Sequence, residues 1–130
     1  MNNAENRKEH DPFNLERFKL AQKDVYARVI GELRSGKKRT HWMWYIFPQI
    51  SGLGTSEISQ RYSIKSREEV QAYLAHPVLG ARLLECSNAI LGVEGRTASE
   101  IFGYPDDIKL KSSMTLFAAI AGKDSVFIKV

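Results

Sequence analysis

The sequence lacks several features that define specialised classes of protein. It has a single cysteine, Cys86, which excludes an intrachain disulfide and is compatible with a reducing compartment. It contains no run of about 18 apolar residues, the length needed for a membrane-spanning helix. The segment Met1–Asp11 has no apolar core and does not resemble a secretory signal. We therefore expect a cytoplasmic protein that does not enter a membrane.

Metal-binding patterns and a strong charge of one sign are also missing. The three histidines, His10, His41 and His76, form no ligand spacing such as H-x-x-x-H with one another or with the cysteine. We expect neither a metal ion nor a cofactor. The net charge of +4 is mild, and the one tight basic cluster, Lys37–Arg39, is shorter than the basic stripe typical of nucleic-acid-binding proteins. Both observations argue against nucleic acid as a partner.

Large side chains are concentrated in the middle of the chain. Both tryptophans lie in the segment KKRTHWMWYIFPQISGL at 37–53, beside three basic residues and a proline. Aromatic side chains bury the largest apolar areas, so this segment is expected to form the centre of the packed core. A chain of 130 residues with 43% hydrophobic residues is long enough for one domain with its own core.

Apolar residues recur at spacings of three and four through most of the chain, which predicts an all-α fold. The first and longest helix should begin at Asp11-Pro12, continue to Leu33 and end at Gly36. Residues Trp42–Phe47 are interpreted as a short buried helix, with a lone strand as the alternative and Thr40 as a candidate cap. Further helices are expected at 56–61, after the capping signals Ser66 and Thr97, after His76-Pro77, over 106–121, and as a first turn at 125–130. The prediction is a compact single domain of six or seven helices over 11–130, several of them short, preceded by a disordered tail at 1–10.

Three segments together resemble one known family. They are HWMWYIFPQISGLG, YLAHPVLGARLLEC and FGYPDDIKLKSSMTLF, and in this order they resemble the bacterial family called domain of unknown function 1810. The resemblance runs from Asp11 to the end of the sequence. It implies a compact, mostly α-helical single domain, and it brings no established activity.

Some members of that family carry the label calpastatin, which implies a disordered protease inhibitor. Disordered inhibitors are poor in large apolar residues, whereas this chain has two Trp, six Phe and five Tyr, so the label does not fit. Similar proteins usually continue past the SVF segment with a further helix. The last helix, which ends at Val130, is therefore expected to be truncated.

Polar residues beside the tryptophan-rich segment predict a binding site. A small anionic ligand, phosphate-like or nucleotide-like, is expected in a pocket between residues 39–49 and a helix over 106–115. Arg39 and Lys109 would supply positive charge, and a tryptophan a flat wall. The full set of expected ligand-binding residues is Arg39, His41, Trp42, Trp44, Gln49, Lys109 and Ser113.

An enzymatic reading of the same site remains an alternative. Because histidine titrates near neutral pH, His41 would act as the base, with Asp107 as its partner. Ser113 is the third catalytic candidate. No Ser-His-Asp order, paired-carboxylate motif or phosphate-binding loop supports a particular reaction. A second alternative is an interaction module that forms homo-oligomers through the apolar chain end, Val126–Val130.

Overall fold

The computed structural model describes residues 11–122 and 125–130. Within these residues no strand forms, and an isolated parallel bridge joins Ile50 to Ile64. The nine helices of this part are α2 (Glu16–Lys23), α3 (Tyr26–Arg34), α4 (Met43–Ile46), α5 (Glu57–Arg61), α6 (Arg67–Ala75), α7 (Leu79–Leu91), α8 (Ala98–Phe102), α9 (Asp106–Ala121) and α10 (Val126–Lys129). The all-α prediction is confirmed, with more helices than the six or seven expected. The predicted disordered tail lies outside the described residues.

The extra helices come partly from the first predicted helix, which is two helices in the structure. It breaks at Asp24 and Val25, so that α2 packs against α4 while α3 packs against α7. The start also differs from the prediction. Residues after Asp11 form a turn, and the Asp11 carboxylate accepts hydrogen bonds from the backbone N–H groups of Leu15 (2.7 Å) and Glu16 (3.1 Å). The predicted helix start at Asp11-Pro12 is therefore wrong: Asp11 does accept from free backbone donors, but Leu15 is the N-cap residue and α2 begins at Glu16.

The tryptophan-rich segment supplies part of the core, as the sequence predicts. Its short helix α4 buries Met43 and Ile46, and Trp42 is buried directly before it. The rings of Trp42, Phe47 and Phe102 lie 6.1–6.2 Å apart in tilted and edge-on pairs. Full burial of a large apolar side chain contributes roughly 1.5–3 kcal/mol, so this trio joins α4 firmly to α8.

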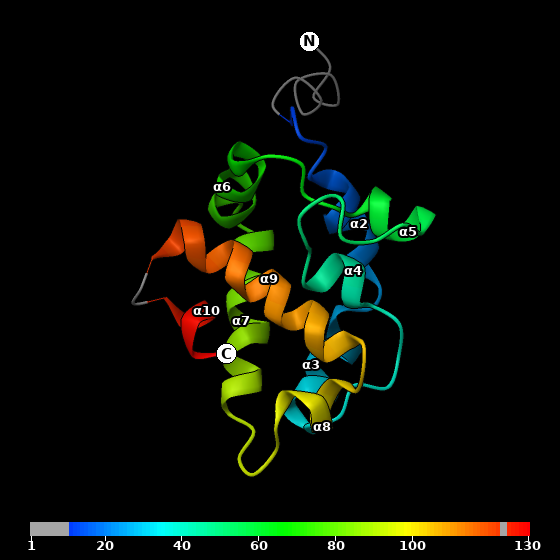
Figure 1. Ribbon diagram of the computed structural model, residues 1–130, viewed down its shortest axis with the longest axis vertical. Coiled ribbons are helices and arrows are strands. Elements are labelled where there is room, and N and C mark those ends of the chain that lie inside the picture. The colour runs from blue at the N-terminus through cyan, green and yellow to red at the C-terminus, as the bar shows by residue number, and fades with distance from the viewer. Residues whose placement is uncertain (1–10, 123–124) are drawn as a thin grey trace.

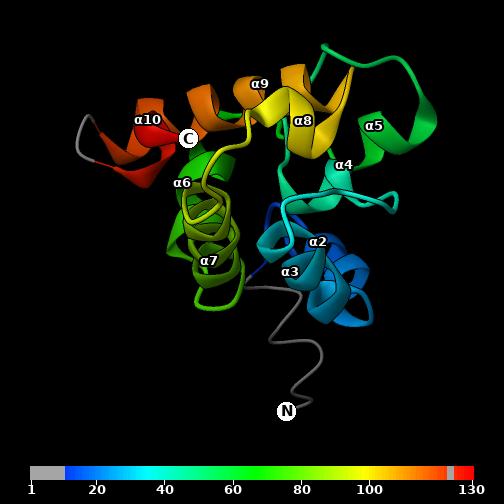
Figure 2. The same ribbon diagram turned by 90° about the horizontal axis from the view of Figure 1, so that it is seen from below.

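Figures 1 and 2 show how the later helices cover the earlier ones. In Figure 2, α8, α9 and α10 lie along the upper side of the molecule, with α7 and α3 below them. α9 contacts α6, α8 and α10, and α7 contacts α3, α6 and α10. The long helix α7 thus joins the early helix α3 to the C-terminal helix α10, which also packs on α9. In the part of the chain that the structure describes, no helix combines the length and the apolar character that a membrane span requires.

Two predicted caps illustrate how local signals set these boundaries. Thr97 and Glu100 form the complete reciprocal capping box at the start of α8, as predicted. Ser66 caps α6 by accepting a hydrogen bond from the Glu69 backbone N–H. The Glu69 carboxylate, however, accepts from the backbone N–H of Lys65 and does not complete the box. Its other oxygen is engaged by a distant residue, as described below.

Candidate functional site

A cavity of about 490 Å³ lies between the loop that follows α4 and the start of α9. Its volume falls within the range of roughly 300–1,000 Å³ that is usual for small-molecule sites. Two of the contributing segments are the ones that the sequence singles out, 39–49 and 106–115. The lining residues are Trp44, Gln49, Ile50, Gly52, Leu53, Gly54, Thr55, Ser56, Ser59, Tyr62, Ser63, Tyr104, Pro105, Ile108, Lys109 and Ser112.

The loop wall of this cavity, residues 51–63, is closed at its base by backbone hydrogen bonds. The N–H of Ser51 donates to the carbonyl of Ile64, and the N–H of Ile64 donates to the carbonyl of Gln49, each at 2.8 Å. Gly52 lies in the left-handed region at φ +97°, a conformation that glycine adopts without strain. The hydroxyl of Ser56 caps the short helix α5 inside the loop. The loop therefore leaves and rejoins the core at one fixed point.

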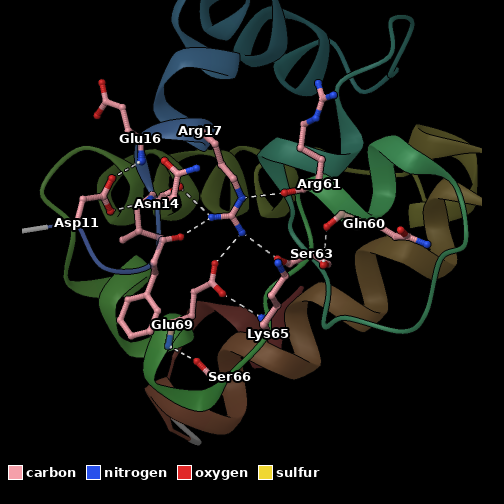
Figure 3. Close-up of polar contacts among 12 residues, drawn as sticks. Asp11, Asn14, Glu16, Arg17, Gln60, Arg61, Ser63, Lys65, Ser66 and Glu69 are labelled. Atoms are coloured by element: carbon pink, nitrogen blue, oxygen red, sulfur yellow. Dashed lines mark hydrogen bonds and ion pairs between the residues drawn. The ribbon is translucent and has the colours of Figure 1, made fainter. Parts of the chain in front are cut away.

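The far end of the same loop is held by Arg17, as Figure 3 shows. The guanidinium donates to the carbonyl oxygens of Arg61 (2.8 Å) and Ser63 (2.9 Å) and to the Glu69 carboxylate (2.7 Å). It also donates to two carbonyl oxygens of the turn before α2. The side chains of Arg17 and Glu69 are 15% and 4% exposed. A buried pair with all donors engaged fixes α2, the loop end and α6 relative to one another.

Among the described residues that line the cavity, Lys109 is the only charged one, and none carries a carboxylate. The ammonium lies 5.3 Å from the centre of the Trp44 ring, a cation–π arrangement. Its nearest anion, Asp106, is 3.7 Å away and is held more closely by Lys38, at 2.8 Å. Two cations therefore share one carboxylate, which leaves an excess of positive charge beside the cavity.

The segment that leads into α4 is held by a buried carboxylate, Glu32 on α3. It accepts hydrogen bonds from the backbone N–H groups of Arg39 (2.7 Å) and Thr40 (3.0 Å). It also accepts from the Thr40 hydroxyl (2.6 Å) and from the indole N–H of Trp42 (3.0 Å). Thr40 therefore binds Glu32 and does not cap α4, which is a correction to the sequence prediction. Burial raises the pKa of Glu32, but these hydrogen bonds outweigh it and lower the pKa to about 2.

The structure places the predicted ligand-binding residues in three different environments. Trp44, Gln49 and Lys109 line the cavity together. Trp42 and Ser113 are buried, and the Ser113 hydroxyl has no hydrogen-bond partner. Arg39 and His41 are exposed on the segment before α4 and are not among the lining residues.

Of the three catalytic candidates, none lines this cavity. Besides exposed His41 and buried Ser113, Asp107 accepts a hydrogen bond from the Ser99 hydroxyl at 2.6 Å. Asp107 lines a separate groove.

Sequence reasoning missed the larger part of the lining. The position of Tyr62 just after the 56–61 helix suggests a core residue, and its ring does pack 5.4 Å from the Tyr45 ring, but it also lines the cavity. The Gly103-Tyr104-Pro105 sequence indicates only a turn. A large aromatic residue in a Gly-Tyr-Pro turn has little to pack against locally, and this signal would have marked it as a candidate. Ser112 lies beside Ser113 in the sequence, and only the helix phase shows that it is the one facing the cavity.

Comparison with known proteins agrees with the resemblance seen in the three segments. The family described as "Protein of unknown function (DUF1810)" matches residues 12–130. The chain belongs to this family. Among solved structures, it is similar to the conserved hypothetical protein Rv1873 from Mycobacterium tuberculosis, with 59% sequence identity and a TM-score of 0.83. The match covers 84% of this chain and 78% of Rv1873. Among curated proteins, none matches the sequence.

This DUF1810 domain has a second, larger groove of about 880 Å³ bordered by α8, α9 and α10. Its floor is apolar, with Leu110, Met114 and Phe127 among the lining residues. At one end it carries Asp107 and Lys111. Neither recess provides a metal centre: over residues 11–122 and 125–130, no three His, Cys, Asp or Glu side chains gather closely enough to hold an ion.

Proposed function

We propose that this DUF1810 protein binds a small anionic ligand, phosphate-like or nucleotide-like, in the cavity between the 49–63 loop and α9. The observation that carries the proposal is the charge of the lining: of the lining residues that the structure describes, Lys109 is the single ionic one, among hydroxyl, amide, aromatic and apolar side chains. An ammonium in a partly enclosed site favours an anion, because a charge-assisted hydrogen bond is stronger there than in open water. Gln49 and Ser112 supply further polar groups on the wall.

The neighbours of Lys109 also leave its ammonium group able to bind an anion. Asp106 lies between Lys38 and Lys109 and is closer to Lys38 by 0.9 Å, from the distances 2.8 and 3.7 Å. Most of the carboxylate's attraction is therefore directed at Lys38, and Lys109 keeps donors for a ligand. Because none of the catalytic candidates lines the cavity, the proposal concerns binding and not a reaction.

Thermal unfolding with and without added anions tests this function. Phosphate, ribose 5-phosphate and nucleoside monophosphates are the probes, and at 100 times the dissociation constant a ligand stabilises the folded protein by about 2.7 kcal/mol. Lys109→Met should weaken binding by about 10- to 150-fold, since a hydrogen bond to a charged group contributes about 1.5–3 kcal/mol.

Lys111→Met provides the matched control. Lys111 is an exposed residue of the same helix that lines the other groove, so its removal should leave anion binding unchanged. The proposal fails if none of the anions shifts the unfolding temperature. It also fails if the two lysine variants lose affinity equally, because the effect would then be one of general charge.

A second candidate function is self-association through the C-terminal segment. The structure buries part of that segment, since Phe127 packs on Phe117 with ring centres 5.8 Å apart. What remains for a partner is the apolar groove together with Ile128, which is 58% exposed at its edge. Light scattering across a range of protein concentrations tests this candidate. Ile128→Ser should abolish a dimer, whereas Leu20→Ser, which changes an equally exposed residue on α2, should not.

A further inference from the structure

Exposed apolar side chains gather at the cavity that contains Lys109. Nine large hydrophobic residues are exposed in the part of the chain that the structure describes, and four of them line this one cavity. Tyr104 is 83% exposed, and Ile50, Leu53 and Ile108 are between 48% and 58% exposed. Scattered exposed hydrophobic residues need no explanation, but a group of them around a polar recess indicates a binding surface.

The α9 side of the cavity shows the order of these groups. Pro105, Ile108, Lys109 and Ser112 follow the spacing i, i+3, i+4, i+7, which places them on one face of the helix. Along this face the character changes from apolar at the start of α9, where Tyr104 precedes it, to cationic and then hydroxyl-bearing. The distance from residue 105 to residue 112 is about 10 Å, at about 1.5 Å of rise per residue. A ligand that lies along the face therefore meets an apolar wall at one end, a positive charge next to it and a hydroxyl group at the other end.

We propose that the ligand is a nucleoside monophosphate, with its phosphate at Lys109 and its base against Tyr104 and the apolar rim. This inference rests on the proposed function and specifies the class of anion. Inorganic phosphate would leave most of the 490 Å³ cavity unfilled, and a sugar phosphate would leave the rim uncovered. An aromatic base covers the rim, because it stacks on a tyrosine ring and still presents polar edges to water.

The loop side of the cavity carries hydroxyl groups that can contact the ribose of the nucleotide. Thr55, Ser56 and Ser59 bring three hydroxyl groups to the lining, and they follow the apolar residues Ile50 and Leu53 in the same loop. The Ser56 and Ser59 hydroxyls donate their protons within the loop, to the Ser59 hydroxyl and the Ser56 carbonyl, and each oxygen can still accept a hydrogen bond from a ribose hydroxyl. Because the apolar residues and the hydroxyls belong to one loop, the base and the sugar contact the same loop.

The test compares two ligands that share the phosphate and the ribose. Isothermal titration with adenosine 5′-monophosphate and with ribose 5-phosphate measures what the base adds. Stacking on one aromatic side chain predicts that the nucleotide binds about 5- to 150-fold more tightly, which corresponds to about 1–3 kcal/mol. Tyr104→Ser should reduce this ratio towards one without changing the affinity for ribose 5-phosphate. Tyr104→Phe should retain the ratio, because stacking does not need the hydroxyl.

Leu84→Ser is the control for loss of an exposed apolar residue elsewhere, on α7, and should leave the ratio unchanged. If both ligands bind equally and both lose affinity in Lys109→Met, the nucleotide inference is wrong while the anion-binding function stands. If neither ligand binds, both are wrong. A ratio that survives in Tyr104→Ser would also overturn the inference, since the base would then contact something other than the rim.

Discussion

The strongest quantitative prediction concerns Glu32, whose four hydrogen bonds hold the segment before α4. Its pKa falls from 4.5 to about 2 in the folded protein. A group with a lowered folded-state pKa stabilises the protein above its unfolded pKa, and this stabilisation is lost as the pH falls towards the folded value. The Glu32 contribution is therefore complete above pH 4.5 and disappears between about pH 4.5 and pH 2. At about 1.4 kcal/mol per pKa unit it amounts to roughly 3 kcal/mol at pH 7 and roughly 1.4 kcal/mol at pH 3.

Glu32→Gln removes this titration and keeps the shape of the side chain. The free energy of unfolding, measured by urea titration, should fall by roughly 3 kcal/mol relative to the unmodified protein at pH 7. The difference should shrink by about half or more at pH 3, because Glu32 itself becomes protonated there. Glu68→Gln, on the exposed side of α6, is the matched control and should show no such convergence. A Glu32→Gln deficit that is the same at pH 7 and pH 3 would refute the reasoning.

Three further predictions concern buried residues elsewhere in the core. Arg17→Met leaves the Glu69 carboxylate buried without its cation and should cost about 3–5 kcal/mol in urea unfolding, of which Arg17→Lys recovers only part. Gly80→Ala would place a Cβ 2.2 Å from a backbone carbonyl oxygen at the end of α6 and should lower the free energy of unfolding, measured by thermal unfolding, by about 1–3 kcal/mol or more. Gly31→Ala, which has open space around it, should be tolerated in the same measurement. Burial raises the pKa of the Cys86 thiol to about 12, so a thiol reagent should react only as fast as the protein unfolds, and rapid reaction of the native protein would contradict this.

The sequence predicts those features of the fold that depend on local signals. The spacing of Leu110, Met114 and Phe117 marks the buried side of α9, and all three are buried. The sequence His76-Pro77 indicates a break between two helices, and the His76 ring nitrogen accepts hydrogen bonds there from the N–H groups of Val78 and Leu79. In both cases the residues that decide the structure lie within a few positions of one another.

Features that depend on residues distant in the sequence escaped prediction. Arg17 and Glu69 are 52 residues apart, and no local pattern reveals that they pair. The two tryptophans show the same difficulty at close range. Trp42 is buried and donates to Glu32, while Trp44 faces the cavity, yet both belong to one apolar run with no clear period. Deciding between them requires the position of α3, which the run itself does not contain.

The cavity is surrounded by ionic groups that are expensive to bury. Glu32 fixes the segment before α4, Arg17 and Glu69 fix the end of the loop, and Lys38 joins that first segment to Asp106 at the start of α9. Well-packed apolar residues can replace a buried ion pair with equal or greater stability. Stability alone therefore does not account for three such groups of ionic contacts around one cavity. Directional bonds hold a backbone in place more narrowly than apolar packing does, and the anion site that we propose at Lys109 and Trp44 would require that accuracy.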